Sequence, residues 1–307
     1  MKRLLISSLL LVTVLCSCEL FPSDEGRIVH VGIGLSYRGC DVQVLPATIN
    51  DAVELSLAFT ELFDKRAFST ELLVQRGVLD EQGVWVYEGS SSPSIPTKER
   101  VLGRLEHWIT TLEAADLLII SYSGHGLEDG SLVLAPTDEG TIFLEAGTVD
   151  ASLLLAVDEL FSLLAQSRAT VFLILDSCYS GNFVRDGDSS VSIVEEREIF
   201  EDAYRCYFSD ASYGPGVFVL SATSCDHTSG EPLAGSHTHG YFTAALLEGL
   251  GWECTGRRLA LRRPFISSDW LYGYILSHQH IPTSSEFSLW YQHPHISGGP
   301  LDLVLVK

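Results

Sequence analysis

Basic side chains are scarce in this sequence of 307 residues, which carries 19 Lys and Arg against 40 Asp and Glu. The formal net charge at pH 7 is −21. Proteins that bind nucleic acids need clustered positive charge to meet the phosphates, so this composition disfavours nucleic acid as a partner. An acidic surface also repels anionic substrates and favours encounter with cationic ones.

Cysteine pairs of the Cys-x-x-Cys type are missing, although the chain has seven cysteines. Structural zinc sites usually rest on such pairs, and we therefore expect no metal site. Two histidine clusters, at 237–239 and 292–295, have spacings like those of metal ligands. No acidic or cysteine motif accompanies them, which favours ordinary loop positions.

Long apolar runs are also rare, and the one at Leu4–Leu15 is too short to span a bilayer as a mature helix. It follows Lys2 and Arg3, a pattern typical of a signal peptide. The segment ends in Leu-Cys-Ser-Cys, which resembles a bacterial lipobox. We predict a lipoprotein signal peptide over residues 1–17 and lipidation of Cys18. Ordinary secretion with an unmodified cysteine is the alternative.

This N-terminus predicts an extracytoplasmic protein, anchored by its lipid to a bacterial membrane on the periplasmic side or at the cell surface. Residues 18–26 would form the tether. Outside the cytoplasm disulfides can form, but an odd number of cysteines remains, so at least one thiol stays free unless chains pair. These cysteines are Cys40, Cys178, Cys206, Cys225 and Cys254.

Behind the tether, apolar strand patterns alternate with amphipathic helix patterns. This alternation predicts a mostly parallel sheet covered on both faces, a three-layer αβα fold, within one α/β domain over residues 27–307. Two strand patterns, at 116–123 and 169–176, are almost wholly apolar, as expected for central parallel strands. Further strands are expected at 27–35, 69–77, 216–223 and 301–306, and helices at 48–63, 97–113, 149–167, 241–251 and from Ser268 or Asp269 onward.

The two most apolar strand patterns end in residues that can do chemistry. One ends in Ser-Gly-His-Gly, with His125, and the other in Asp-Ser-Cys-Tyr-Ser-Gly, with Cys178. Sites in open α/β sheets lie at the carboxyl ends of adjacent strands, so imidazole and thiol should come within hydrogen-bonding reach. Such a pair makes a strong nucleophile. A packed histidine and an inert buried cysteine are the plain alternative, which two motifs in this order disfavour.

These motifs resemble the caspase and metacaspase family of cysteine peptidases, more closely its bacterial metacaspase-like (orthocaspase) branch. A histidine precedes the nucleophilic cysteine by about 50 residues in caspases, and the separation here is 53. The blocks INDAVELSLAF, DGSLVLAPTD, LSATSCDHTSGE and GYFTAALLEGL match the family's order over residues 27–251. The resemblance implies a caspase-like fold and a cysteine endopeptidase. In that mechanism Cys178 attacks the scissile carbonyl, His125 protonates the leaving amine, and the Gly126 and Cys178 N–H groups form the oxyanion hole.

The resemblance also implies a specificity. Asp176, two residues before the cysteine, would line the primary pocket and select protein or peptide substrates with Arg or Lys. Asp226 is the best match to a second acid of the family. The alternatives are a turn-capping carboxylate for the first and a loop surface residue for the second. The animal caspases' Asp-binding arginine is missing before the INDA block, although Arg38 lies upstream, and Tyr179 replaces the usual metacaspase histidine.

Activation is the least specified part of this prediction. Many metacaspases need calcium, but no acidic ligand set can be matched here, and we expect no cofactor. The polar segment 183–215 contains Arg185, Arg197 and Arg205, which are candidates for self-cleavage. The rival function is a non-catalytic binding module at the membrane surface, although such homologues typically lose the His or the Cys. Ligation by the same pair is a weaker third option.

Overall fold

The computed structural model describes most of the predicted domain, and some of the predicted sites lie outside the described residues. The signal peptide, Cys18, the segment with Arg185, Arg197 and Arg205, and Asp226 all lie outside the described residues. The structure describes residues 26–89, 92–137, 140–144, 147–184, 216–225, 227–232, 238–279, 292–298 and 301–304.

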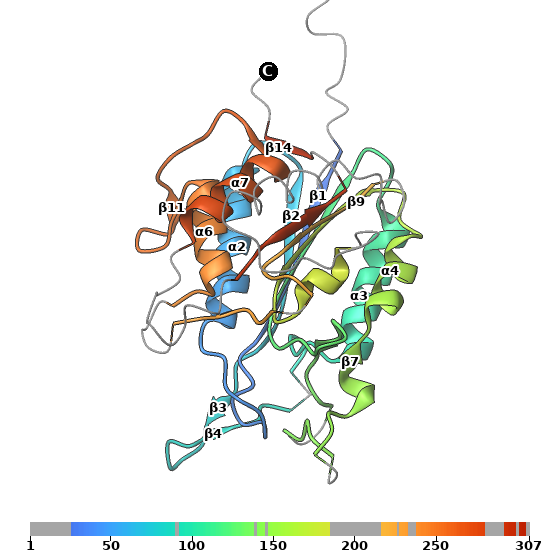
Figure 1. Ribbon diagram of the computed structural model, residues 1–307, viewed down its shortest axis with the longest axis vertical. Helices are drawn as coiled ribbons and strands as arrows, with labels where there is room; N and C mark the ends of the chain where they lie inside the picture. The colour runs from blue at the N-terminus through green and yellow to red at the C-terminus, as the bar shows by residue number, and fades with distance from the viewer. Residues whose placement is uncertain are drawn as a thin grey trace, which may run out of the picture.

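A six-stranded sheet, in the order β13-β9-β8-β5-β1-β2, forms the centre of the fold (Figure 1). Five of the strands run parallel, and β13 pairs antiparallel with β9 at one edge. The carboxyl ends of the parallel strands therefore meet at one edge of the sheet. The strands are β1 (Ile28–Leu35), β2 (Phe68–Gln75), β5 (Leu117–Ser123), β8 (Thr170–Asp176), β9 (Val217–Ser221) and β13 (His295–Ser297).

Helices cover both faces of the sheet, and each face has its own hydrophobic core (Figure 1). Helices α2 (Thr48–Leu62), α6 (Tyr241–Leu250) and α7 (Ser268–His278) pack on one face. Helices α3 (Lys98–Thr111) and α4 (Val157–Leu164) pack on the other. The predicted α/β fold with three layers and a mostly parallel sheet is confirmed.

Burial on both faces explains the apolar character of the central strands. In β5, Leu118 and Ile120 belong to the core under α3 and α4, whereas Leu117 and Ile119 face the core under α2 and α6. Successive side chains of a strand point to opposite faces, so a strand covered on both sides needs apolar residues at every position. The same alternation runs through β8.

Within the described residues, four short strand pairs and two 3-10 turns lie outside the central sheet. The helix expected at 149–167 begins only at Val157, because Asp150 accepts from the Ser152 N–H and caps a 3-10 turn instead. No helix within the described ranges is long and apolar enough to cross a membrane. The pairs are β3 (Val78–Leu79) with β4 (Trp85–Val86), β6 (Leu132–Val133) with β7 (Leu154–Leu155), β10 (Trp252–Glu253) with β11 (Arg258–Leu259), and β12 (Ile266–Ser267) with β14 (Asp302–Val304); the turns are η1 (Ala151–Leu153) and η2 (Ser180–Phe183).

Candidate active site

Strand register brings the two motifs together at the carboxyl edge of the sheet. β5 and β8 are neighbours, with Ser123 opposite Asp176, and His125 and Cys178 each follow two residues later. The contact continues past the strands, because the Gly124 N–H donates to the Asp176 carbonyl at 3.3 Å. The prediction that these strands are adjacent is therefore confirmed, while the roles of the two side chains stay predictions.

Gly126 lies directly against the backbone of Cys178. A Cβ atom at this position would stand 2.2 Å from the Cys178 carbonyl oxygen, a distance that real Cβ atoms do not tolerate. None of the described hydrogen bonds uses the N–H of Gly126 or of Cys178 on another backbone group. An oxyanion hole needs two N–H donors close to the nucleophile, so the role of these two groups stays a prediction.

His125 is held in one tautomer by the loop that follows β1. Its Nε2 lies 2.8 Å from the Gln43 carbonyl oxygen, which only accepts, so Nε2 carries the proton and Nδ1 keeps a lone pair. The His125 N–H donates to Tyr37 Oη at 3.0 Å, and the two rings lie 4.6 Å apart. Burial lowers the pKa of His125, although the bond to Gln43 opposes this shift. The ring is thus neutral at pH 7 and able to accept a proton.

The thiol of Cys178 points elsewhere in this structure. Its Sγ donates to the Ser229 carbonyl oxygen at 3.7 Å, and no hydrogen bond joins it to His125 among the described contacts. Burial raises the pKa of Cys178, so the resting group is a thiol rather than a thiolate. Catalytic hydrogen bonds are often long or misaligned without substrate. A rotation of the cysteine side chain would be needed to reach Nδ1.

Two residues with left-handed backbone conformations flank the pair. Tyr37, which contacts His125, has φ of 57°, and Tyr179, which follows Cys178, has φ of 56°. Neither is glycine, and such a conformation costs on the order of 1 kcal/mol or more in a residue with a side chain. The Tyr179 N–H donates to the His227 carbonyl at 2.8 Å, which helps to hold the turn. Local strain of this kind is typical of functional sites.

Asp176 is buried beside the thiol, with 7% of its surface exposed. Its Oδ1 accepts from Ser229 Oγ at 2.6 Å, and its Oδ2 accepts from Thr243 Oγ1 at 2.7 Å and from the Thr243 N–H at 3.2 Å. Burial, and then the charge of Asp51, raise the pKa of Asp176 to about 6. The carboxyl group therefore bonds side chains of the site, and its partners lie beyond the local turn.

Asp51 is a second acid of this site, which the sequence reasoning missed. It lies in the first turn of α2, where Oδ2 accepts from Ser123 Oγ at 2.7 Å and Oδ1 from His239 Nδ1 at 2.9 Å. Burial lowers the pKa of His239, but bonding to Asp51 outweighs this and raises it to about 10. His239 is therefore an imidazolium that neutralises Asp51. The INDA block, which matched the resemblance, contained the signal.

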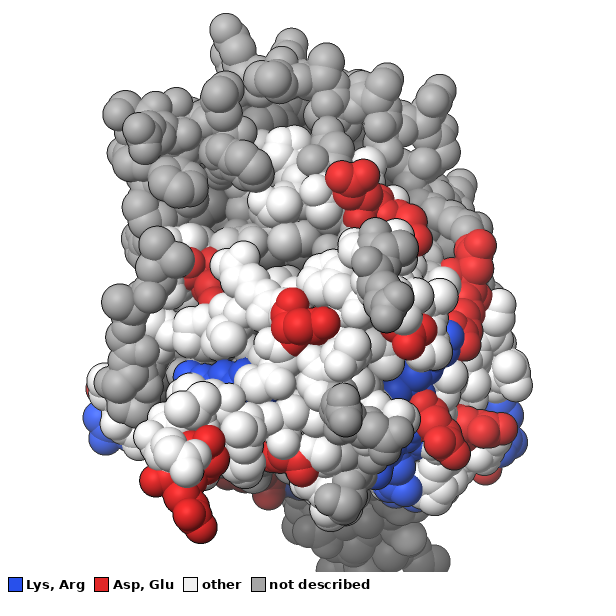
Figure 2. Space-filling model, turned by 90° about the horizontal axis from the view of Figure 1, so that it is seen from below, with Lys and Arg blue, Asp and Glu red and all other residues white. Residues whose placement is uncertain are grey.

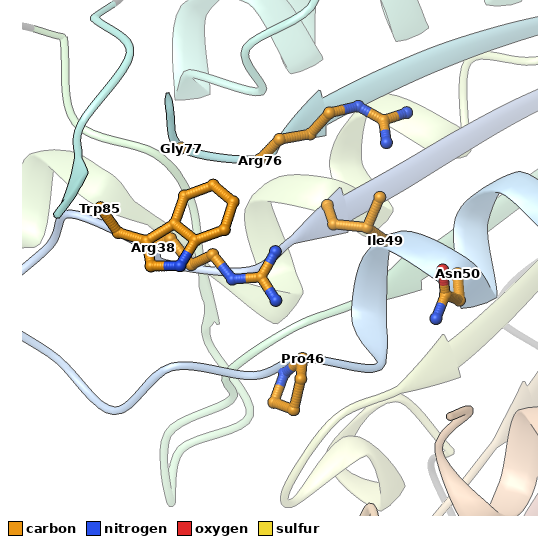
Figure 3. Close-up of a pocket in the computed structure, with 7 residues that line it drawn as sticks. All are labelled: Arg38, Pro46, Ile49, Asn50, Arg76, Gly77 and Trp85. Carbon is orange, nitrogen blue, oxygen red and sulfur yellow. The ribbon is translucent and has the colours of Figure 1, made fainter. Parts of the chain in front are cut away.

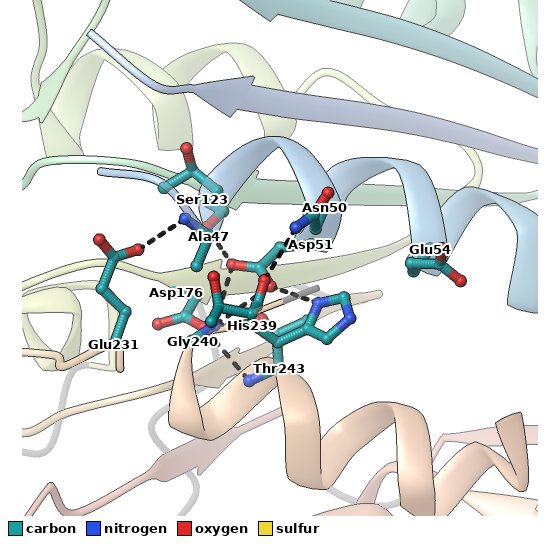
Figure 4. A network of polar contacts seen from close by, with 12 residues as sticks. Ala47, Asn50, Asp51, Glu54, Ser123, Asp176, Glu231, His239, Gly240 and Thr243 are labelled. Carbon is teal, nitrogen blue, oxygen red and sulfur yellow. Dashed lines mark hydrogen bonds and ion pairs between the residues drawn. The ribbon is translucent and has the colours of Figure 1, made fainter. Parts of the chain in front are cut away.

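Glu231 is the third acid, and Figure 4 shows it on the far side of Asp51 and Asp176 from Thr243. Its Oε2 accepts from the Ala47 N–H at 3.0 Å, just before α2 begins. Burial and the charges of the two aspartates raise the pKa of Glu231 to about 7. Three carboxyl groups against one imidazolium form a strongly acidic site, which we call the acidic cluster.

No metal site accompanies these acids. No group of three or more His, Cys, Asp or Glu side chains in the described ranges is arranged to hold a metal ion. A calcium site therefore cannot be assigned to these residues. The described cysteines Cys40, Cys178, Cys225 and Cys254 are all free.

Comparison with known proteins places these residues within a family pattern. The family model described as metacaspase, peptidase C14 domain, matches residues 30–186, which include His125, Cys178, Asp51 and Asp176. No curated protein matches this sequence.

Two solved structures resemble the chain at low identity. The protein GSU0716 from Geobacter sulfurreducens is 16% identical, with 90% of this chain and 93% of that chain covered and a TM-score of 0.49. Caspase-1 from Spodoptera frugiperda is 13% identical, with 92% and 91% covered and a TM-score of 0.49.

Proposed function

Since this chain belongs to the metacaspase, peptidase C14 family, we propose that it is a cysteine endopeptidase that cleaves peptide bonds after Arg or Lys. The observation that carries the proposal is the register of β5 and β8, in which His125 and Cys178 follow paired strand ends. A non-catalytic binding module would not need both residues at this edge of the sheet.

The chemistry follows from the orientation of the imidazole. The Cys178 thiol gives its proton to His125 Nδ1, and Sγ forms a bond to the scissile carbonyl carbon. The N–H groups of Gly126 and Cys178 stabilise the oxyanion. When the C–N bond breaks, the imidazolium returns the proton to the leaving amine. Water then adds to the thioester carbonyl carbon and gives one proton to His125. The C–S bond breaks as the acid product forms, and the imidazolium returns that proton to the Cys178 sulfur.

The preference for a basic residue rests on the acidic cluster. A guanidinium or ammonium group entering beside Asp176 would meet a carboxyl group whose pKa is raised by burial. Its positive charge would lower the pKa of that carboxyl group and form a charge-assisted hydrogen bond. A substrate aspartate would be repelled by the same acids.

Self-processing and anchoring complete the proposal. The segment with Arg185, Arg197 and Arg205 connects Val184, six residues after the cysteine, to Gly216, the residue before β9. Cleavage there would leave both halves of the central sheet in place. Lipidation of Cys18 would hold the enzyme at a bacterial membrane outside the cytoplasm, where its partners would be proteins with exposed basic residues.

A fluorogenic peptide panel with Arg, Lys or Asp at the cleaved position tests the proposal. Wild-type protein should hydrolyse the Arg and Lys peptides, and Cys178→Ala should not. Cys225→Ala is the matched control, because Cys225 is an exposed free thiol whose backbone carbonyl accepts from Asn182, four residues after Cys178. Absence of any Cys178-dependent hydrolysis would overturn the proposal that the protein is a peptidase. Cleavage after Asp alone would overturn the proposal that the acidic cluster selects basic residues.

A further inference from the structure

A cavity with a charge opposite to that of the acidic cluster opens on the same edge of the sheet, at the ends of β1 and β2 (Figure 3). Its volume is about 400 Å³. Two arginines and a tryptophan give it a chemical character unlike that of the acidic cluster. We call it the basic cavity, and its lining residues are Arg38, Pro46, Ile49, Asn50, Arg76, Gly77 and Trp85.

The two arginines differ from most other basic residues of the described chain. Neither Arg38 nor Arg76 forms an ion pair with any carboxylate among the described residues. The nearby Glu88 carboxylate accepts from the backbone N–H of Arg76 at 2.7 Å, not from its guanidinium. By contrast, ion pairs with Asp or Glu engage Arg27, Lys98, Arg104, Arg168, Arg257, Arg258 and Arg262.

The walls of the basic cavity orient the guanidinium group of Arg38. The Arg38 guanidinium lies 4.4 Å from the centre of the Trp85 ring, a cation–π contact that orients it and leaves its N–H donors free. Figure 3 shows the Arg38 guanidinium directed toward the start of α2 and the Arg76 side chain extending past Ile49. That helix begins without a capping side chain.

Two unpaired arginines are notable on a chain with a net charge of −21. Figure 2 looks onto the molecule from the end where the β3–β4 hairpin lies, and acidic side chains are spread over this face. An anionic ligand approaching it needs a locally positive place to bind. The pair of arginines in a cavity provides one.

The basic cavity is close to the catalytic edge. In the order β2-β1-β5-β8, Arg76 and Arg38 follow β2 and β1, and His125 and Cys178 follow β5 and β8. Neighbouring strands lie about 4.8 Å apart, so the cavity is roughly 5–14 Å from the pair. The connection is also covalent, because the loop that supplies the Gln43 carbonyl to His125 continues into Pro46 of the cavity wall.

The geometry points to the basic cavity as a second substrate subsite, which binds an acidic side chain of the peptide that the enzyme cleaves. An extended peptide advances about 3.3 Å per residue, so the acid would stand about two to four residues from the cleaved position. Its carboxylate would bond the guanidinium groups of Arg38 and Arg76, and its methylene groups would lie against the exposed face of Trp85. Opposite charges in two subsites fix the register of the bound peptide. This inference rests on the proposed function.

A positional scan tests the subsite. Peptides with Arg at the cleaved position and Ala elsewhere would carry a single Asp at each of four positions on either side. Wild-type protein should favour Asp over Ala about tenfold in kcat/KM at one position, or two adjacent ones. The variants Arg38→Gln and Arg76→Gln should reduce this preference, and the double variant should abolish it while cleavage after Arg persists.

Arg168→Gln is the control, since it removes the same charge from an exposed ion pair with Glu113. Thermal unfolding checks that each variant folds. Arg76 is exposed, so its variant should keep the test available if Arg38→Gln is unstable.

A binding measurement separates this inference from the proposed function. Fluorescence anisotropy with labelled peptides and Cys178→Ala protein should show the same Asp preference without turnover. Hydrolysis with no Asp preference overturns the subsite and leaves the peptidase intact. Asp-dependent binding that needs both arginines, without hydrolysis by wild type, supports the subsite and overturns the peptidase. Inorganic phosphate that binds through the arginines, with no Asp preference in any peptide, overturns the peptide assignment in favour of a free anion.

Discussion

The acidic cluster and the basic cavity lie on the same edge of one sheet, yet they treat charge in opposite ways. Asp51 and Asp176 are buried and hydrogen-bonded on both oxygens, whereas Arg38 and Arg76 face an open cavity without a carboxylate partner in the described chain. Burial raises the pKa of Asp176 to about 6, so the charge of this carboxyl group depends on pH and on a nearby cation. Guanidinium groups stay charged at every accessible pH. The charge of the acidic cluster therefore depends on conditions, whereas the charge of the basic cavity is permanent.

The largest expected effect comes from removing the central acid. Asp176→Asn keeps the shape of the side chain but removes the carboxylate, and loss of one partner of a buried charge pair costs about 2–5 kcal/mol. This range corresponds to a fall in kcat/KM for Arg peptides of about thirtyfold to about five-thousandfold. Peptides with citrulline, the uncharged analogue of Arg, should be affected much less. An equal loss for both substrates would assign Asp176 to the fold or the chemistry instead of to recognition.

Gly126→Ala should be nearly as damaging, and for a steric reason. The added Cβ would collide with the Cys178 carbonyl oxygen, so the two oxyanion donors would move apart. We expect kcat to fall about a hundredfold, as for the loss of an oxyanion donor. Assays of kcat and thermal unfolding on the same preparation would separate lost catalysis from lost folding.

Gly103→Ala is the matched control for this substitution. Gly103 lies inside α3, and a Cβ there would meet no heavy atom within 4 Å. Alanine favours the helix over glycine by about 0.5–1 kcal/mol. This variant should keep full activity and unfold at a slightly higher temperature. A loss of activity here would show that the assay reports general perturbation.

A pH series contrasts the two regions directly. Asp176, with a pKa of about 6, and Glu231, with a pKa of about 7, are protonated in the fold at pH values where the unfolded chain is ionised. The folded state thus binds more protons, and their contribution to stability falls as pH rises from about 4 to 7. The ratio of Arg to citrulline cleavage should rise over pH 5 to 8.

The Asp preference of the basic cavity should stay constant over the same range. Arginine does not titrate there, and the substrate aspartate has an ordinary pKa of about 3.9. Ratios of rates cancel the titration of His125, which affects all substrates equally. An Arg preference that does not change with pH would contradict the raised pKa values of Asp176 and Glu231.

The smallest effect is expected at the edge of the acidic cluster. Glu231→Gln removes a like charge from beside Asp176 and keeps the acceptor for the Ala47 N–H. Glu231, with a pKa of about 7, is mostly protonated where Asp176 titrates near pH 6, so the substitution should leave that part of the pH dependence in place. The Arg preference should fall only a few fold at pH 8, where Glu231 is charged. A loss at pH 8 as large as that of Asp176→Asn would contradict this assignment.

The fold and the adjacency of the strand ends that carry His125 and Cys178 were open to prediction because they rest on local patterns. A strand buried on both faces is apolar throughout, and two such strands in sequence are adjacent in most parallel sheets. The position of each motif is then known, because each comes directly after the carboxyl end of its strand.

The acidic cluster was only partly predictable, because its partners meet through long-range packing. His239 bonds Asp51 across 188 residues, and Glu231 bonds Ala47 across 184. No periodicity links such positions. The basic cavity needs the β3–β4 hairpin to bring Trp85 over Arg38, and the sequence pattern had not indicated that hairpin.

The most direct test of the central claim is mass spectrometry after labelling with a peptide acyloxymethyl ketone that carries Arg at its reactive end. The account predicts one adduct, on Cys178, that forms more slowly in His125→Ala and in Asp176→Asn. A matching reagent that carries Asp in place of Arg should form hardly any adduct. Preferential labelling of exposed Cys225, or equal labelling by the Arg and Asp reagents, would contradict it.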